Sequence, residues 1–496
     1  MTGRDDGPAR MRGALLVAGT SSDAGKTVLV AALCRWLARQ GVAVAPYKAQ
    51  NMSLNSVVAA DGAEIGRAQA MQAAAAGIDA EAAMNPVLLK PGANHTSQVV
   101  VLGQPYADVD ALSYRQLAPQ LRAIALDSLA DLRARFDVVI CEGAGSPAEI
   151  NLRDTDIVNM GLAQPAKLPV IVVGDIDRGG VFASLYGTLA LLDAADQALI
   201  RGWVINKFRG DVRLLQPGLD RLSALTNRPF YGVLPWLDGL WLDVEDSLDL
   251  GSYADSADAD ALRVAVIRLP RISNFTDIDA LAAEPNVSVR FTTAPVDVAD
   301  ADLVVLPGTR ATVADLLWLR DRGLADALLA RAAKGRPVLG VCGGYQMLGE
   351  SITDDVESRS GTVPGLGILP VRTAFAPGKT LGRPTGVTAD GDRVAAYEIH
   401  HGVISAHGGE PLFTTATGAE GTRLGATWGT VWHGVLENDA FRRSFLLDVA
   451  SFGGREFRAG SVAFAVARQR RLDALADHVG THLDMPALVD VITSAG

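Results

Sequence analysis

The stretch Leu15-Leu-Val-Ala-Gly-Thr-Ser-Ser-Asp-Ala-Gly-Lys-Thr27 decides the fold of the first half of this chain. A short apolar run enters a loop that closes on Gly-Lys-Thr, and a helix-compatible segment follows from Val28 to Arg39. This order is typical of a phosphate-binding loop between a buried strand and a helix. It predicts an α/β domain built on a parallel sheet.

The loop offers the groups that a nucleoside triphosphate needs. Thr20 and Gly25 belong to a loop whose backbone N–H groups surround phosphates, and Lys26 supplies a positive charge for the β- and γ-phosphate oxygens. Thr27 supplies a hydroxyl ligand for Mg²⁺ at the helix N-terminus. Because five residues rather than the usual four separate Gly19 from Gly25, the match is to a variant of the pattern. We predict binding of ATP with Mg²⁺.

Two polar residues follow later strand-like runs of the first half. Apolar runs at 14–18, 42–46, 138–141, 170–173 and 202–205 alternate with helix-like segments, which predicts βαβ units in one parallel sheet. Glu142 follows the third run at the carboxyl edge, where open α/β sheets bind ligands, and is our second metal ligand. A surface turn would also suit it. Asn206 follows the fifth run and would either read the adenine edge or cap a helix.

A second α/β unit is predicted beyond the stretch 236–261, which is rich in Asp and Ser and which we interpret as a linker. Strand-like runs recur at 263–268, 303–307, 338–341 and 429–432, and a helical pattern occupies 457–492. We therefore divide the chain into a phosphate-binding domain (1–235), the linker (236–261), a second α/β domain (262–450) and a helical extension (451–496).

Cys342 follows the run at 338–341 and precedes two glycines. This arrangement predicts a nucleophile on a strand-to-helix turn, with the N–H groups of Gly343 and of Gly308 as donors to an oxyanion. His433 follows the run at 429–432 and is the predicted proton carrier. A single histidine is more often structural, and a cysteine after a strand can be a buried thiol. The combination favours acyl chemistry.

Composition limits the partners and the compartment. The formal net charge of −11 provides no basic surface for nucleic acid. The apolar run after residue 12 is too short for a signal peptide or a membrane span. The three cysteines are too few for a disulfide framework, so we expect a cytoplasmic protein. Cys34 and Cys141 are interpreted as small buried hydrophobic residues.

Several segments resemble those of the cobyric acid synthases, the glutamine-dependent amidases of corrinoids. They are Lys48–Ser56, Arg67–Gln72, Met84–Pro91, Glu142–Asn151, Asp175–Phe182, Asn206–Asp211, Leu306–Thr312 and Cys342–Gln346. The resemblance covers nearly the whole chain. It implies an N-terminal P-loop synthetase domain, similar to dethiobiotin synthetase, and a C-terminal class I glutamine amidotransferase domain with a flavodoxin-like α/β fold.

The same resemblance implies a reaction. The b, d, e and g carboxylates of adenosylcobyrinic acid a,c-diamide would be amidated to adenosylcobyric acid, with ATP and glutamine consumed. ATP would convert each carboxylate into an acyl phosphate, and Cys342 would release ammonia from glutamine. The expected partners are therefore small molecules, glutamine and the adenosylated corrinoid, rather than nucleic acid or a membrane.

One position departs from the pattern of class I amidotransferases. Those enzymes carry a glutamate two residues after the histidine, where this chain has Val435. We therefore predict a pair of Cys342 and His433, with Glu437 as the candidate third partner.

Two alternatives stay open on the sequence. A cobyrinic acid a,c-diamide synthase, or another ATP-dependent glutamine amidotransferase, would have the same two domains but act on other carboxylates. A partition-type regulatory ATPase would share the phosphate loop, but it would leave Cys342 and His433 without a role.

Overall fold

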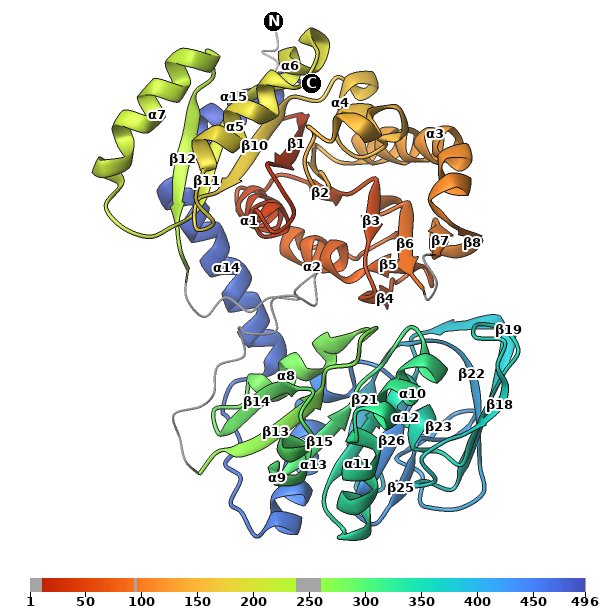
Figure 1. The fold of residues 1–496 in the computed structure, drawn as a ribbon. Coiled ribbons are helices and arrows are strands. Elements are labelled where there is room, and N and C mark those ends of the chain that lie inside the picture. The colour runs from red at the N-terminus through yellow and green to blue at the C-terminus, as the bar shows by residue number, and fades with distance from the viewer. Residues whose placement is uncertain (1–10, 93–95, 238–259, 496) are drawn as a thin grey trace, which may run out of the picture.

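The computed structural model describes residues 11–92, 96–237 and 260–495. Two α/β domains, the upper and lower halves of Figure 1, are each built around a six-stranded sheet. The predicted α/β fold class, with parallel sheets, is thereby confirmed. The predicted linker falls almost entirely outside the described residues.

The first sheet is fully parallel. Its strands follow the order β12 (Phe230–Pro235), β11 (Ile200–Phe208), β10 (Val170–Asp175), β1 (Gly13–Gly19), β9 (Val138–Glu142) and β2 (Val44–Tyr47). Alternate residues of β1 enter the hydrophobic cores on opposite faces of the sheet. Burial on both faces explains why this strand is a continuous apolar run in the sequence.

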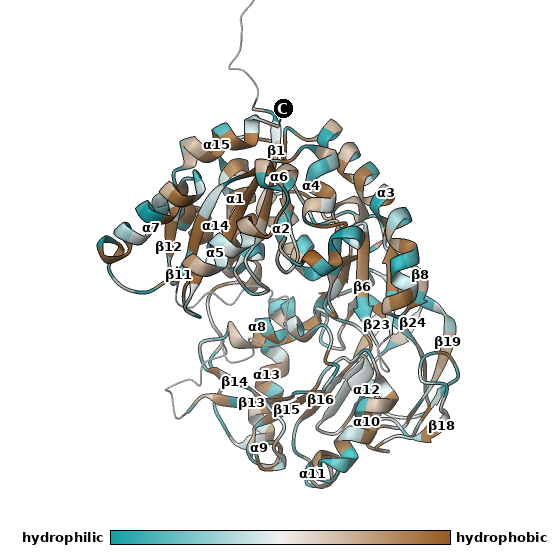
Figure 2. Ribbon diagram, turned by 45° about the horizontal axis from the view of Figure 1, so that its top comes forward, coloured by the Kyte–Doolittle hydropathy of each residue, from teal (hydrophilic) through white to brown (hydrophobic). Residues whose placement is uncertain are grey.

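Helices cover both faces of the first sheet (Figure 1). They include α1 (Lys26–Arg39), α3 (Ala111–Arg135), α4 (Met160–Ala166), α5 (Val181–Ala190), α6 (Ala194–Leu199) and α7 (Val212–Thr226). Figure 2 shows hydrophilic residues along α3 and α4 and hydrophobic strands behind the helices. The sheet is therefore a buried layer, and ligands can reach it at the ends of its strands.

An insertion between β2 and β9 faces the second domain (Figure 1). It contains β3 (Gln50–Met52), β4 (Ser56–Val58), β5 (Glu64–Gly66), α2 (Arg67–Ala76), η1 (Ala82–Met84), β6 (Val87–Pro91), β7 (Ser97–Val101) and β8 (Gln104–Val109). Strands β3, β6, β7 and β8 form a four-stranded sheet. The predicted βαβ alternation did not include it.

The second sheet is parallel except at one edge. Its strands follow the order β14 (Val287–Thr292), β13 (Leu262–Ile267), β15 (Leu303–Leu306), β16 (Val338–Val341), β26 (Thr427–Thr430) and β25 (Thr422–Leu424). Only β25 is antiparallel to its neighbour. Because β26 ends at Thr430, two residues earlier than predicted, His433 lies in the turn beyond the strand.

Helices and two further four-stranded sheets complete the second domain. One sheet is mixed, because β17 and β19 pair in parallel, and the other is antiparallel. The helices are η4 (Phe275–Ile278), α8 (Asp279–Ala282), α9 (Pro295–Asp300), α10 (Thr312–Asp321), α11 (Leu324–Ala333), α12 (Gly343–Leu348), η5 (Val435–Glu437) and α13 (Asp439–Gly453). The added strands are β17 (Ser351–Asp354), β18 (Gly361–Pro364), β19 (Val371–Gly382), β20 (Thr385–Val387), β21 (Arg393–Ala395), β22 (Glu398–Ala406), β23 (Phe413–Thr415) and β24 (Gly418–Glu420).

The C-terminal helices connect the two domains. Helix α14 (Phe464–His482) runs from the lower domain to the upper one in Figure 1, and α15 (Met485–Thr493) packs beside β1. Phe464 belongs to the core of the second domain, whereas Leu472 and Leu488 belong to the core of the first. Among the residues that the structure describes, no helix is both long and apolar enough to cross a membrane.

Candidate active site

Cys342 lies at the turn between β16 and α12. Its backbone has φ 50° and ψ −110°, a conformation that costs a non-glycine residue about 1–3 kcal/mol. The helix that follows packs tightly on the neighbouring strand, because a Cβ atom at Gly344 would lie 1.9 Å from the carbonyl oxygen of Leu306. The turn therefore holds the thiol at the carboxyl edge of the sheet.

His433 is held in one orientation by its neighbours. Its Nδ1 lies 2.7 Å from Oδ2 of Asp277, and the Gly434 N–H donates to Oδ1 of the same carboxylate at 2.7 Å. The Tyr397 ring stacks on the imidazole with 5.2 Å between ring centroids. Since Nδ1 is occupied, Nε2 is the nitrogen left for proton exchange with Cys342.

The structure contradicts Glu437 as the third partner. The Glu437 carboxylate pairs with Nη2 of Arg67 at 2.7 Å, and Asp277 bonds to His433 instead. Asp277 comes from η4, which follows the first strand of this domain, so it reaches the same carboxyl edge as Cys342 and His433. In the sequence, Asp277 follows a strand-like run, and this position is the pattern that could have indicated it. A search limited to the residues next to His433 in the sequence does not find Asp277.

The charge state of His433 follows from these contacts. Burial lowers the pKa of His433, but the charges of Asp277 and Cys342, with hydrogen bonds to both, outweigh burial and raise the pKa to about 10. The imidazole is therefore protonated at neutral pH, and its positive charge lies in the same cavity as the sulfur of Cys342. Cys34 and Cys141 differ, because burial raises the pKa of each thiol far above its ordinary value. Their interpretation as buried hydrophobic residues is confirmed.

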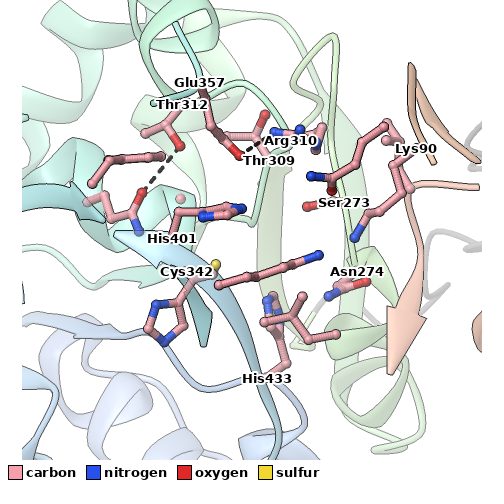
Figure 3. Close-up of a pocket in the computed structure, with 18 residues that line it drawn as sticks. Lys90, Ser273, Asn274, Thr309, Arg310, Thr312, Cys342, Glu357, His401 and His433 are labelled. Carbon is pink, nitrogen blue, oxygen red and sulfur yellow. Dashed lines mark hydrogen bonds and ion pairs between the residues drawn. The ribbon is translucent and has the colours of Figure 1, made fainter. Parts of the chain in front are cut away.

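Residues of both domains line the cavity that contains Cys342 and His433. Lys90 and Gln98 come from the first domain, and Figure 3 shows Lys90 reaching in toward Asn274. On the second domain, Thr309, Arg310 and His401 also line the cavity. The thiol site is thus complete only when the two domains are docked.

The two predicted oxyanion donors lie beside Cys342 and His433. Gly343 lines the cavity and is the first residue of α12, whose first N–H groups have no acceptor within the helix. A Cβ atom at Gly308 would lie 3.1 Å from Cε1 of His433. Their role as oxyanion donors stays a prediction.

A buried ion cluster joins the domains beside this cavity. Glu64 is 0% exposed, and its Oε1 accepts hydrogen bonds from Lys90 Nζ and, at 2.7 Å, from Ser56 Oγ. Its Oε2 accepts from Nζ of Lys379, on the β19 strand of the second domain. Burial raises the pKa of Glu64, but the two lysines outweigh that effect and hold it far below its ordinary value.

We expect Glu64→Gln to destabilise the protein. The substitution leaves Lys90 and Lys379 buried without their counter-charge, and breaking a buried ion pair in this way costs about 3–5 kcal/mol. Guanidinium denaturation should show a lower midpoint. Glu350→Gln is the control, because Glu350 meets Arg372 and His407 at the surface, and it should leave the midpoint unchanged. A native midpoint for Glu64→Gln would contradict the role of the cluster.

The phosphate loop lies between β1 and α1 in the first domain. Gly25 has φ 95°, and a Cβ atom there would lie 2.0 Å from Nδ2 of Asn206. Asn206 Nδ2 donates to the Ala24 carbonyl at 2.9 Å, so this side chain supports the loop from behind. Lys26 Nζ donates to the carbonyls of Ser21 (2.8 Å) and Gly145 (3.3 Å).

Glu142 is the centre of a buried polar cluster next to the loop. Its carboxylate accepts hydrogen bonds from Thr27 Oγ1 (2.8 Å), Lys48 Nζ (2.8 Å) and Gln72 Nε2 (2.5 Å). The structure therefore brings the two predicted metal ligands, Thr27 and Glu142, together. It adds Lys48 and Gln72, to which the sequence interpretation gave no role. Both are polar residues within the segments that carried the family resemblance.

The donors at this cluster fit Mg²⁺. The Thr27 hydroxyl and the Glu142 carboxylate are hard oxygen donors that lie within 2.8 Å of each other. In the parts of the chain that the structure describes, no group of three or more His, Cys, Asp and Glu residues could hold a metal. Two protein donors are typical of Mg²⁺ sites that rely on phosphate and water for their other ligands.

Comparison with known proteins gives the same two-part division. Residues 15–248 match the family described as the CobQ/CobB/MinD/ParA nucleotide binding domain, and residues 263–441 match the CobB/CobQ-like glutamine amidotransferase domain. A cobyric acid synthase of Frankia casuarinae is 64% identical, over 96% of this chain and 96% of the relative. Another, of Streptomyces avermitilis, is 60% identical, over 98% of this chain and 97% of the relative.

Proposed function

The chain belongs to the cobyric acid synthase family, and on this premise we propose how its two sites share a glutamine-dependent amidation. Cys342 and His433, in the amidotransferase domain (262–450), release ammonia from glutamine. The phosphate loop, in the synthetase domain (1–235), activates a corrinoid carboxylate with ATP. The observation that carries this proposal is the contact of His433 with Asp277 beside a thiol on a strained turn. We place the reaction in the cytoplasm.

The thiolate begins glutamine hydrolysis. Cys342 Sγ attacks the carbonyl carbon of the glutamine side-chain amide, and the developing oxyanion meets the N–H groups of Gly343 and Gly308. Protonated His433 gives its Nε2 proton to the departing nitrogen, which leaves as ammonia. The imidazole then takes a proton from water, which attacks the thioester and releases glutamate. Asp277 holds the imidazole in place in both steps and stabilises its positive charge whenever the ring is protonated.

Activation of the carboxylate belongs to the phosphate loop. A carboxylate does not react with ammonia at a useful rate, whereas an acyl phosphate does. Lys26 binds the γ-phosphoryl oxygens, and the loop N–H groups from Thr20 to Gly25 hold the phosphate chain. Thr27 and Glu142 would hold Mg²⁺, which neutralises phosphate charge when bound. Asn206 positions the loop, and we also retain it as a candidate reader of the adenine edge.

Ammonia is released at the boundary between the domains. Lys90 and Gln98 of the synthetase domain line the thiol cavity, so ammonia forms against the domain that consumes it. In neutral water, ammonia is largely protonated and cannot attack a carbonyl carbon. Release at this boundary therefore favours transfer inside the protein over transfer through solvent.

The test is an incubation with Mg-ATP, glutamine and adenosylcobyrinic acid a,c-diamide, followed by mass spectrometry of the corrinoid. We expect successive replacements of OH by NH₂ at four carboxylates. If glutamine is hydrolysed and ATP is turned over but no corrinoid is amidated, the two proposed reactions stand and this corrinoid is rejected as the substrate. Absence of glutamine hydrolysis would reject the role of the thiol site.

A further inference from the structure

A second cavity, of about 660 Å³, lies in the first domain. Its walls come from β3, from the start of α3 and from the segment 144–159 that follows β9. Ligand pockets commonly measure ~300–1,000 Å³. The cavity therefore has room for a molecule much larger than glutamine.

Apolar side chains line this cavity where it meets solvent. Met52, Leu112 and Leu152 belong to its lining and are 56%, 73% and 54% exposed. Large exposed apolar residues gathered around one hollow mark a binding surface, because a ligand that covers them removes them from water. Since the three residues come from separate segments, the ligand needs a broad apolar face.

Polar groups at the same cavity are available to a ligand. Arg115 is an exposed lining residue, and within the described ranges its side chain has no ion pair or hydrogen bond. Oδ1 of Asn159 is buried and lacks a partner in the same ranges, while its Nδ2 donates to the Ala144 carbonyl at 2.6 Å. The carboxylates of Asp110 and Asp156 already accept hydrogen bonds from backbone N–H groups. A ligand carboxylate would therefore find its counter-charge at Arg115.

One loop separates this cavity from the phosphate loop. Ala144 and Ser146 line the cavity, and the carbonyl oxygen of Gly145, between them, lies 3.3 Å from Nζ of Lys26. Lys26 is the residue assigned to the γ-phosphoryl group. A carboxylate held at this end of the cavity is therefore next to the place of phosphoryl transfer.

We propose that this cavity binds the corrinoid, an inference that rests on the proposed function. The apolar face of the macrocycle covers Met52, Leu112 and Leu152. One peripheral carboxylate lies beside Ser146 for phosphorylation, and another pairs with Arg115. A large ring with an apolar face and several carboxylates around its rim supplies both kinds of group that the cavity requires.

The test is Leu112→Glu, with Leu214→Glu as the matched control. Both leucines lie in the first turn of a helix that an aspartate caps, but Leu214, which is 85% exposed, lies in α7 and is not part of the cavity. Binding of adenosylcobyrinic acid a,c-diamide to the full chain is measured by equilibrium dialysis, read by the absorbance of the corrinoid. We expect Leu112→Glu to weaken corrinoid binding roughly tenfold or more. The variant should keep native ATP binding and native glutamine hydrolysis. Leu214→Glu should change none of the three.

The outcomes separate the two proposals. If the native protein amidates the corrinoid and Leu112→Glu binds it with native affinity, the assignment of the cavity is overturned and the proposed function stands. Loss of ATP binding in Leu112→Glu would also overturn the assignment, because the cavity would then hold the nucleotide. If the native protein neither binds nor amidates the corrinoid, the proposed function itself fails.

A second variant tests the charge at the rim of the cavity. Arg115→Gln should weaken corrinoid binding and make the remaining binding less sensitive to salt, because the screened ion pair is gone. An unchanged salt dependence would remove Arg115 from the site.

Discussion

Replacing Cys342 by serine is expected to abolish amidation driven by glutamine and to leave amidation driven by ammonium salt. Serine keeps the shape of the turn, but its hydroxyl stays protonated beside His433. It therefore does not attack glutamine, and no acyl-enzyme forms. Loss of a nucleophile that works with a positioned histidine costs at least about 10³-fold in rate. Added ammonia bypasses this step, because the acyl phosphate forms in the other domain. The measurement is amide formation on the corrinoid with each nitrogen source.

Lys26→Ala is the complementary variant. It removes the charge that binds the γ-phosphoryl group, so both nitrogen sources should fail together. The Cys342→Ser variant could instead form no amide with either nitrogen source while it still binds ATP and unfolds like the native protein. That result would contradict the division into two independent sites.

The sheets were predictable because their strands are buried on both faces. Strands such as β1 and β10 are continuous apolar runs in the sequence, and the order of strand, glycine loop and helix reflects the geometry of phosphate binding. The insertion after β2 was not predictable from alternation. Its strand β3 has three residues, Gln50–Met52, and none of the long apolar character that marks a buried strand.

The site was predictable wherever one short segment carries the chemistry. Cys342 and Lys26 each lie in a local pattern of strand, turn and helix, which the sequence displays directly. Asp277 acts on a histidine 156 residues away, and only the order of strands in the sheet brings the two together. Glu64 and Lys379 meet across the domain boundary, so only the docking of the two domains brings them together.

Asp277→Asn is the second substitution with a large expected effect. The amide has nearly the shape of the carboxylate but removes the charge that raises the pKa of His433, so that pKa should fall. Replacing the corresponding aspartate of a catalytic triad costs about 10⁴-fold in kcat. We expect about 10²–10⁴-fold here, because a thiol ionises more readily than a serine hydroxyl. Glutamine hydrolysis should fall by this factor, while ammonia-driven amidation remains.

The pH dependence distinguishes loss of charge from loss of structure. The pKa of His433 is raised to about 10 in the folded protein, above the ordinary value of about 6.5, so its protonation stabilises the fold fully below about pH 6.5. That contribution is lost as pH rises through about 10. In Asp277→Asn the imidazole should lose its proton at lower pH than in the native protein, as followed by NMR of the imidazole. Glu437→Gln is the control, because Glu437 pairs with Arg67 rather than with the histidine. If Glu437→Gln slowed glutamine hydrolysis as much as Asp277→Asn, the assignment of Asp277 would be wrong.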